Sequence, residues 1–179
     1  MPTVLTHGVA AAAIGAAILP RRTGWRTWSA GIACAMLPDV DVIAFGIGIP
    51  YSAMLGHRGL SHSIFFAAIL TMLAAFALRG RTPPNARLRV WQFLFAASLS
   101  HGILDAFTNG GLGIAFFGPF SSERYFFSVR PIEVSPIGAG FFSRRGLDVL
   151  KSEMLWVWLP AAALVVVSLA YRDGKRTRQ

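Results

Sequence analysis

The feature that most constrains this chain is a series of long apolar stretches that contain few charges. Five of them approach the roughly 20 residues that a helix needs to cross a bilayer. Charged residues make up 14% of the chain, well below the roughly 25% that is typical of soluble domains. The sequence therefore predicts an all-α, polytopic membrane protein with about five transmembrane helices, which we place at Pro2–Pro20, Trp28–Ile49, Gly59–Leu78, Val90–Thr108 and Met154–Tyr171.

Five spans and their connections use up the 179 residues, so we expect a single membrane-embedded domain over residues 1–179. One long connection, Asn109–Glu153, precedes the last span. Its apolar part, 111–120, is suited to lie in the interface or to re-enter the membrane. The single cysteine, Cys34, excludes an intramolecular disulfide and a cysteine-based zinc site.

The net charge of +9 does not indicate nucleic-acid binding, because the basic residues lie between apolar runs and form no single stripe. Lys and Arg are retained in cytoplasmic loops. This rule predicts the N-terminus outside, the long connection extracytoplasmic and the C-terminus in the cytoplasm. Eleven of the 17 basic residues would then be cytoplasmic: Arg21, Arg22, Arg26, Arg79, Arg81, Arg87, Arg89, Arg172, Lys175, Arg176 and Arg178.

Histidines and aspartates are concentrated in or beside the apolar runs. A charged side chain in hydrocarbon costs several kcal/mol, so it is kept where it is paired, hydrated or bound to something. With the orientation above, five of these side chains lie near the outer face of the membrane: His7, His57, His62, His101 and Asp105. Their convergence predicts a functional site at that face. The whole set is His7, Asp39, Asp41, His57, His62, His101 and Asp105.

The spacing of these residues limits their geometry. His101 and Asp105 are four residues apart and share a helix face. Asp39 and Asp41 follow Pro38, so either they serve different partners or the backbone is not helical there. His57 falls in a loop. His62 is expected in the first turn of a helix, with Ser61 as its N-cap.

Imidazole and carboxylate side chains without thiolates are the ligands expected of zinc, manganese or iron. Such a metal activates water for hydrolysis. Arg58 could neutralise a phosphate or a developing oxyanion. Structural alternatives remain open for each group: a packed His7, a structural hydrogen bond between His101 and Asp105, a turn at Asp39–Asp41, and an ordinary loop charge at Arg58.

The motifs that carry these residues also resemble a known family, the YdjM-type inner-membrane, metal-dependent hydrolases, whose founding member is LexA-regulated. The resemblance runs in order from residue 6 to about 132, and Ser61 stands where most relatives are expected to have Thr. The spacing of His and Asp is also distantly similar to that of zinc phospholipase C. The matching motifs are Thr6-His7-Gly8, Leu37-Pro38-Asp39-Val40-Asp41, His57-Arg58-Gly59-Leu60-Ser61-His62-Ser63, Ser100-His101-Gly102-Ile103-Leu104-Asp105, Gly118-Pro119-Phe120-Ser121, Arg124 and Arg130-Pro131-Ile132.

The resemblance implies a location in the bacterial cytoplasmic (inner) membrane and hydrolysis of a phosphoester, such as a phospholipid of that membrane. Zinc is the first choice of cofactor, as one or two ions, with manganese or iron as alternatives. The alternative functions are an intramembrane proton or ion pathway and a non-catalytic membrane protein. The expected metal ligands are His7, Asp41, His62, His101 and Asp105; the expected catalytic residues are Arg58, Asp39 and His57; and Arg58 and Arg130 are expected to bind substrate.

Overall fold

The computed structural model describes residues 1–176, whose regular secondary structure is helical, with no β-strand. Arg178, one of the basic residues of the predicted cytoplasmic tail, lies outside the described residues. The seven α-helices are α1 (Val4–Ile18), α2 (Trp25–Met36), α3 (Ile43–Gly46), α4 (Ile64–Leu78), α5 (Arg87–Ala106), α6 (Arg144–Glu153) and α7 (Leu159–Arg176).

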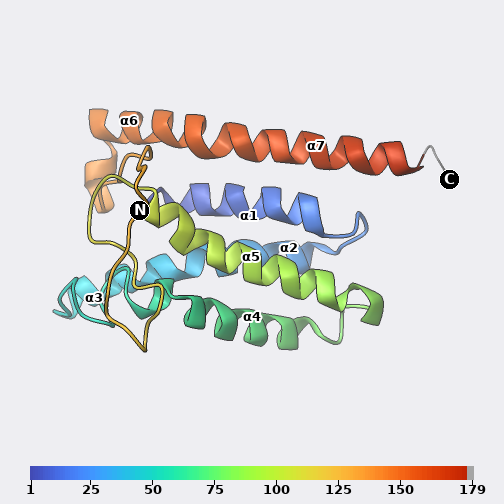
Figure 1. The fold of residues 1–179 in the computed structure, drawn as a ribbon, viewed down its shortest axis with the longest axis horizontal. Coiled ribbons are helices and arrows are strands. Elements are labelled where there is room, and N and C mark those ends of the chain that lie inside the picture. Colours follow the sequence, from blue (N-terminus) through green and yellow to red (C-terminus); the bar gives the residue numbers. More distant parts are fainter. Residues whose placement is uncertain (177–179) are drawn as a thin grey trace.

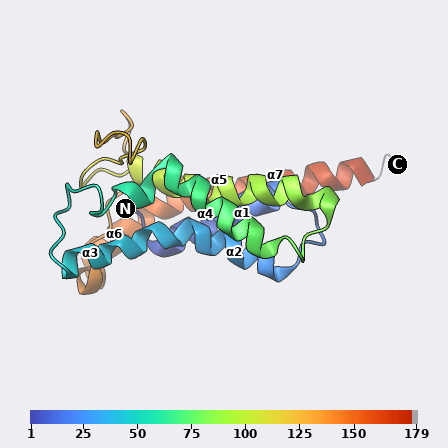
Figure 2. The same ribbon diagram turned by 90° about the horizontal axis from the view of Figure 1, so that it is seen from below.

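Five long helices form the bundle and lie side by side (Figures 1 and 2): α1, α2, α4, α5 and α7. α1 packs against α2, α5 and α7, and α4 packs against α5 and α2. One end of the bundle, here called the loop end, holds α3, α6 and the segments 47–63 and 107–143. The opposite end, here called the turn end, holds the α1–α2 and α4–α5 connections. Seven of the predicted cytoplasmic arginines lie in these connections or in the first turns of α2 and α5.

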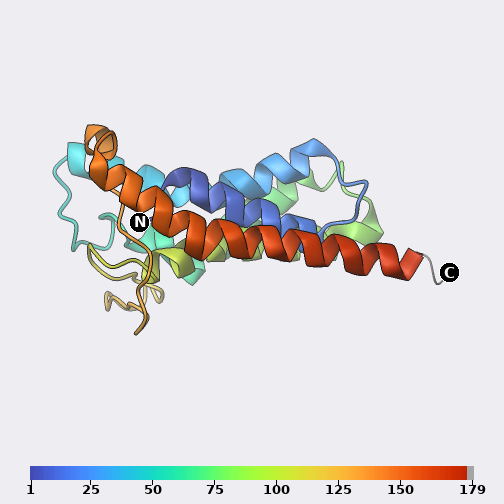
Figure 3. The same cartoon turned by 90° about the horizontal axis from the view of Figure 1, so that it is seen from above.

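The last helix begins earlier than the sequence suggests. It starts at Arg144, where α6 leads through a π-helical turn, η5 (Met154–Trp158), into α7. The predicted span, Met154–Tyr171, falls within this longer helix. The helical turns before Met154 were not predicted because α6 is amphipathic and polar, so no apolar run marks it. Figure 3 shows the combined helix extending along the whole bundle.

Two other local features position the site. Pro38 lies in the first turn of a 3₁₀ helix, η1 (Leu37–Val42), so the backbone leaves α-helical geometry where the two aspartates stand. The N-cap of α4 is Ser63, whose hydroxyl accepts a hydrogen bond from the Phe66 amide at 3.0 Å. The predicted cap at Ser61 was therefore wrong, because Ser61 uses its hydroxyl to contact the site instead.

The apolar core lies toward the turn end and is centred on Phe93, which is fully buried. Its ring reaches two helical glycines. A Cβ on Gly31 would lie 2.1 Å from the Phe93 ring, and one on Gly15 would lie 2.9 Å from it. The small residues thus let α1 and α2 approach α5 closely.

Two helical segments are long and apolar enough to cross a membrane: Trp25–Gly46, with 22 residues, and Arg144–Gly174, with 31 residues. α1 and α4 are apolar but have 15 residues each. Five membrane spans therefore stay a prediction.

Candidate metal centre

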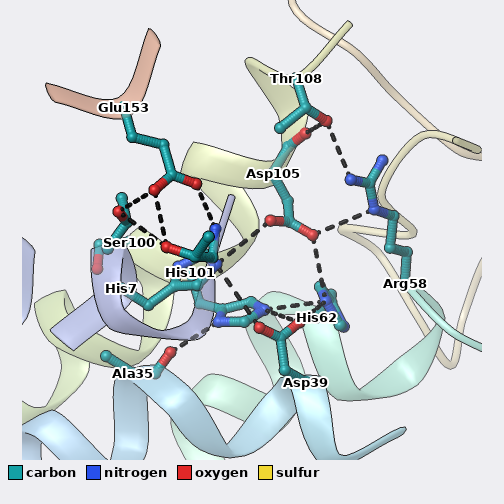
Figure 4. A network of polar contacts seen from close by, with 12 residues as sticks. His7, Ala35, Asp39, Arg58, His62, Ser100, His101, Asp105, Thr108 and Glu153 are labelled. Atoms are coloured by element: carbon teal, nitrogen blue, oxygen red, sulfur yellow. Dashed lines mark hydrogen bonds and ion pairs between the residues drawn. The ribbon is translucent and has the colours of Figure 1, made fainter. Parts of the chain in front are cut away.

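Five buried histidine and aspartate side chains meet at the loop end of the bundle (Figure 4). They come from four different elements. α1 contributes His7, η1 contributes Asp39, a short 3₁₀ helix η2 (Leu60–His62) contributes His62, and the last turns of α5 contribute His101 and Asp105. Each is at most 5% exposed.

Four of these side chains form a group that could hold a metal ion: Asp39, His62, His101 and Asp105, whose ligand atoms lie within 4.8 Å of one another. His101 Nε2 is 2.9 Å from His62 Nε2 and 3.4 Å from Asp39 Oδ1. His62 Nε2 is 3.4 Å from Asp105 Oδ2. Ligands of a tetrahedral zinc ion stand about 3.3 Å apart when each bond is about 2.0 Å, so these distances suit one ion.

The hydrogen bonds of the two imidazoles assign their tautomers. His101 Nδ1 lies 2.7 Å from the carbonyl oxygen of Ala35, and a carbonyl accepts only, so Nδ1 carries the proton. His62 Nδ1 lies 3.0 Å from the Ser61 hydroxyl, which gives its own proton to Asp41, and 3.2 Å from an Asp41 oxygen, so this Nδ1 also carries a proton. Both Nε2 atoms then present lone pairs to each other. A proton or a cation between the two rings relieves this repulsion.

The carboxylates of the group favour the cation. Neither oxygen of Asp39 and neither oxygen of Asp105 accepts a hydrogen bond of good geometry from residues 1–176, although all four atoms are buried. Buried polar atoms without partners are costly, and a metal ion satisfies several of them at once. The donor set of two neutral imidazoles and two carboxylates therefore fits a divalent ion.

Asp41 belongs to a second group, with His57 and His62, that also has metal-ligand spacing. Its oxygens are already used, however. They accept hydrogen bonds from His57 Nδ1 at 2.5 Å, from the Arg58 amide at 3.1 Å and from the Ser61 hydroxyl. A carboxylate that accepts from a metal-ligating histidine fixes the orientation of the ring. In this position Asp41 could orient the His62 ring.

Asp39 and Asp41 thus serve different partners, and the backbone between them is a 3₁₀ helix. The structure places Asp39 among the four donors that face one another, and Asp41 behind His62.

His7 lies beside the four-residue group but is not a member of it. Its Nε2 atom is 3.5 Å from Asp105 Oδ1 and 3.8 Å from Asp39 Oδ2, and its ring stacks on His101 with centroids 3.8 Å apart. Neither ring nitrogen has a hydrogen-bond partner among residues 1–176. His7 therefore stands as a further candidate ligand beside the four-residue group.

Arg58 is fully buried and adopts the left-handed backbone conformation, with φ 62°. Its Nε atom is 3.1 Å from Asp105 Oδ2. Its other nitrogens donate to the carbonyl oxygens of Gly110 and Leu112, at 2.9 and 2.8 Å, and to the Thr108 hydroxyl at 3.0 Å. The guanidinium is thus engaged inside the protein, where it holds Asp105 and the loop that follows α5.

A second arginine, Arg124, fastens the loops that cover the site. It donates to the carbonyl oxygens of His57 and Gly113, at 3.0 and 3.3 Å, and of Tyr51 and Ala53, at 2.9 and 3.1 Å. Burial raises the pKa of the Tyr51 phenol, so its hydroxyl remains protonated near neutral pH. The backbone amide of Leu112 donates to this hydroxyl.

The structure does not bring Arg130 to the buried group. Arg130 is exposed, and its guanidinium lies over the Phe126 ring, 4.8 Å from the centroid.

Sequence reasoning gave no role to Glu153, which the structure buries completely. Glu153 accepts hydrogen bonds from the amide and hydroxyl of Thr3 and from the hydroxyl of Thr6, which is next to His7. The Trp158 indole donates to the same Thr6 hydroxyl at 2.7 Å. The sequence contained one sign of this role, because Glu153 is an acidic residue directly before an apolar run. Its hydrogen-bond partners are about 150 positions away, however, and no local sequence pattern identifies them.

A family model described as YdjM inner membrane protein matches residues 1–174. This chain belongs to the YdjM inner membrane protein family. Inner membrane protein YbcI of Escherichia coli (strain K12) is 39% identical to it over 166 residues, which cover 92% of this chain and 95% of that protein. No solved structure matches the chain significantly.

Membership of the YdjM family makes this chain an inner membrane protein, as the resemblance implied. The buried histidine and aspartate group therefore belongs to a membrane protein, where such residues are rare and tend to be functional.

Proposed function

We propose that this YdjM-family protein is a membrane-embedded hydrolase that uses one divalent metal ion, zinc in the first place, to cleave a phosphoester of a membrane lipid. One observation carries the proposal: two imidazole Nε2 atoms face two carboxylates in a buried site, and among the described residues these carboxylates accept no hydrogen bond of good geometry, with Arg58 as the ion-pair partner of Asp105. A metal ion bound there would supply a water of lowered pKa and a Lewis acid for the phosphoryl oxygens.

In this proposal Asp39, His62, His101 and Asp105 hold the ion. The Ala35 carbonyl orients His101, and Asp41 orients His62. One ion is favoured over two because Asp41, which a second ion would need, already accepts several hydrogen bonds.

His57 is our candidate for the group that accepts a proton during the reaction. Its Nδ1 atom donates to Asp41, so its Nε2 atom is the one available to take up a proton. A histidine oriented by a carboxylate is a common general base. Arg130, exposed in the loop at the same end of the bundle, is our candidate for contacting the lipid phosphate, because the Arg58 guanidinium is already bound within the protein.

We place the loop end on the extracytoplasmic side, with five spans, the N-terminus outside and the C-terminus inside. The arginines of the turn end support this orientation through the positive-inside rule.

The distribution of buried charge argues against the alternative of a proton pathway. Among residues 1–174, every buried His, Asp, Glu and Arg belongs to the loop end of the bundle. A relay requires titratable groups through the thickness of the membrane.

The proposal is tested on protein purified in detergent, by metal analysis and by hydrolysis of phospholipid in mixed micelles. We expect about one zinc per chain and a phosphoesterase activity, and we expect both to be lost in His101→Ala and in Asp105→Asn. Asp148→Asn is the matched control because Asp148 is exposed and pairs with Lys151 on α6. Unchanged metal content in both site variants would overturn the proposal.

A further inference from the structure

A cavity of about 450 Å³ opens at the turn end of the bundle, where the α1–α2 and α4–α5 connections meet (Figure 1). Three arginine side chains line it. Arg22 comes from the first connection, Arg81 from the second connection and Arg89 from the start of α5. None of the residues that line the cavity is acidic. The cavity therefore gathers positive charge without a counter-charge in its own wall.

The arginines of the cavity differ from two neighbouring arginines that have partners. Arg21 forms an ion pair with Asp173, which is the one acidic residue at the turn end of residues 1–176. Arg172 donates to the Ala17 carbonyl at 2.7 Å. The three guanidinium groups of the cavity, in contrast, make no ion pair and no hydrogen bond with the described residues. Like charges that share a cavity repel one another, so a bound anion would stabilise all three.

The inner wall of the cavity adds uncharged hydrogen-bond donors. Thr27 is 8% exposed and lines the cavity, yet its hydroxyl makes no hydrogen bond within residues 1–176. The N-cap of α2, Gly24, lines the cavity too, and no side chain caps the first amides of this helix. A helix N-terminus carries partial positive charge and binds anions. A buried hydroxyl, uncapped helix amides and three guanidinium groups thus border one cavity.

We propose that this cavity binds a phosphate group. Guanidinium groups donate paired hydrogen bonds to phosphate oxygens, and the hydroxyl and the amides supply further donors. α2 begins one of the two segments that are long enough to cross a membrane. We therefore expect its start, where Trp25 is 71% exposed, at the level of the lipid headgroups. Basic pockets between membrane helices bind anionic headgroups at this level.

The headgroup of an anionic phospholipid and free phosphate share this chemistry, so the experiment has one arm for each source. The cavity lies at the opposite end of the bundle from the metal centre. The inference therefore does not depend on the proposed hydrolase, and binding measures it without any activity.

The first arm is native mass spectrometry of the full chain in detergent micelles that contain equal amounts of phosphatidylglycerol and phosphatidylcholine. We expect the wild type to retain one phosphatidylglycerol per chain in preference to phosphatidylcholine. The double variant Arg22→Gln/Arg89→Gln should weaken this retention about tenfold or more, because charge-assisted hydrogen bonds are lost. Arg26→Gln/Arg87→Gln is the matched control. It removes the same charge from the same end at two exposed arginines that do not line the cavity, and should retain the lipid as the wild type does.

The second arm replaces phosphatidylglycerol with inorganic phosphate. Bound phosphate that Arg22→Gln/Arg89→Gln loses, without a preference for phosphatidylglycerol in the first arm, would support the cavity with free phosphate as its ligand. A preference for phosphatidylglycerol that the same variant loses would support the cavity with a lipid as its ligand.

A third variant separates loss of the ligand from loss of the fold. Gly24→Asp places a carboxylate at the N-cap of α2, where no atom lies within 4 Å of a Cβ and where aspartate favours the helix. We expect this carboxylate to take the place of the anion, so that binding falls while the midpoint of thermal unfolding does not. The inference would be overturned by a wild type that binds no inorganic phosphate and does not prefer phosphatidylglycerol. Equal losses of binding in the Arg22→Gln/Arg89→Gln variant and its control would also overturn it.

Discussion

Asp41 and Asp105 stand on different sides of the same histidine, and their hydrogen bonding separates their roles. Asp41 accepts from His57, from Ser61 and from a backbone amide. Asp105 has an ion pair with Arg58 and otherwise faces the imidazoles. A carboxylate that orients a ligand tunes metal affinity, whereas a carboxylate that binds the ion is needed for binding itself.

Asp41→Asn is therefore expected to lower the affinity for zinc about 10–100-fold while one ion still binds at saturation. Titration against a competing chelator measures this change, with Asp148→Asn as the control. If Asp41→Asn abolished binding even at saturating zinc, Asp41 would be a ligand and the assigned role would be wrong.

The Arg58 guanidinium donates several hydrogen bonds in different directions, which a lysine cannot reproduce because its ammonium is a single compact donor group. Arg58→Lys should leave the Gly110 and Leu112 carbonyls without their donors and should cost about 1–3 kcal/mol of stability. Thermal unfolding in detergent measures the loss. Arg145→Lys is the control because the Arg145 side chain is 49% exposed in its pair with Glu133. Equal losses in both variants would contradict the structural role of Arg58.

At the residue scale, the sequence identified the histidines and aspartates because charged groups in apolar runs are costly and therefore conspicuous. It did not separate Asp39 from Asp41, since that difference depends on the 3₁₀ turn after Pro38. The buried position of Arg58 was not predictable either, because its carbonyl partners lie more than 50 positions away.

At the scale of the helices, close packing around Phe93 should make α2 sensitive to a single methyl group. Alanine normally stabilises a helix interior relative to glycine by about 1 kcal/mol. Gly31→Ala should instead destabilise the protein by about 1–3 kcal/mol, because its Cβ would lie 2.1 Å from the buried ring. Gly8→Ala, in α1, is the control, because its Cβ would meet its nearest neighbours at ordinary contact distances of 3.5 and 3.6 Å. A Gly31→Ala variant at least as stable as the wild type in thermal unfolding would contradict this packing.

Glu153 should be the residue that holds the start of the last helix on α1. In Glu153→Gln, an amide replaces a carboxylate oxygen that accepts from the Thr3 and Thr6 hydroxyls, so we expect a loss of about 1–3 kcal/mol. The midpoint of thermal unfolding reports it. Asp148→Asn, an exposed change on the same helix, should leave the midpoint unchanged, and a similarly small effect of Glu153→Gln would remove this role.

The approximate positions of the long helices could be predicted because each carries an apolar run. The start at Arg144 could not, since the amphipathic sequence of α6 is not apolar, and the cap of α4 shifted from Ser61 to Ser63 because Ser61 is used by Asp41. Hydropathy locates apolar helices well, but it carries no information on turns whose geometry depends on partners far away in the sequence.

For the whole molecule, the arginines at the turn end predict that this end faces the cytoplasm, and that the loop end with its buried charges faces the outside of the membrane. A fluorescent protein that folds only in the cytoplasm should fluoresce when it is fused to the C-terminus. Alkaline phosphatase, which is active only outside the cytoplasm, should be inactive when it is fused at the same position. The opposite result would place the metal centre on the cytoplasmic side and contradict the proposed orientation.

The central claim, that Asp39, His62, His101 and Asp105 hold one metal ion, is tested most directly by X-ray absorption on the purified protein loaded with zinc. We expect two imidazole nitrogens at about 2.0–2.1 Å and oxygen ligands at about 2.0–2.2 Å, and we expect His101→Ala to retain no zinc that gives this spectrum. A spectrum without histidine ligands, or one that His101→Ala leaves unchanged, would contradict this claim.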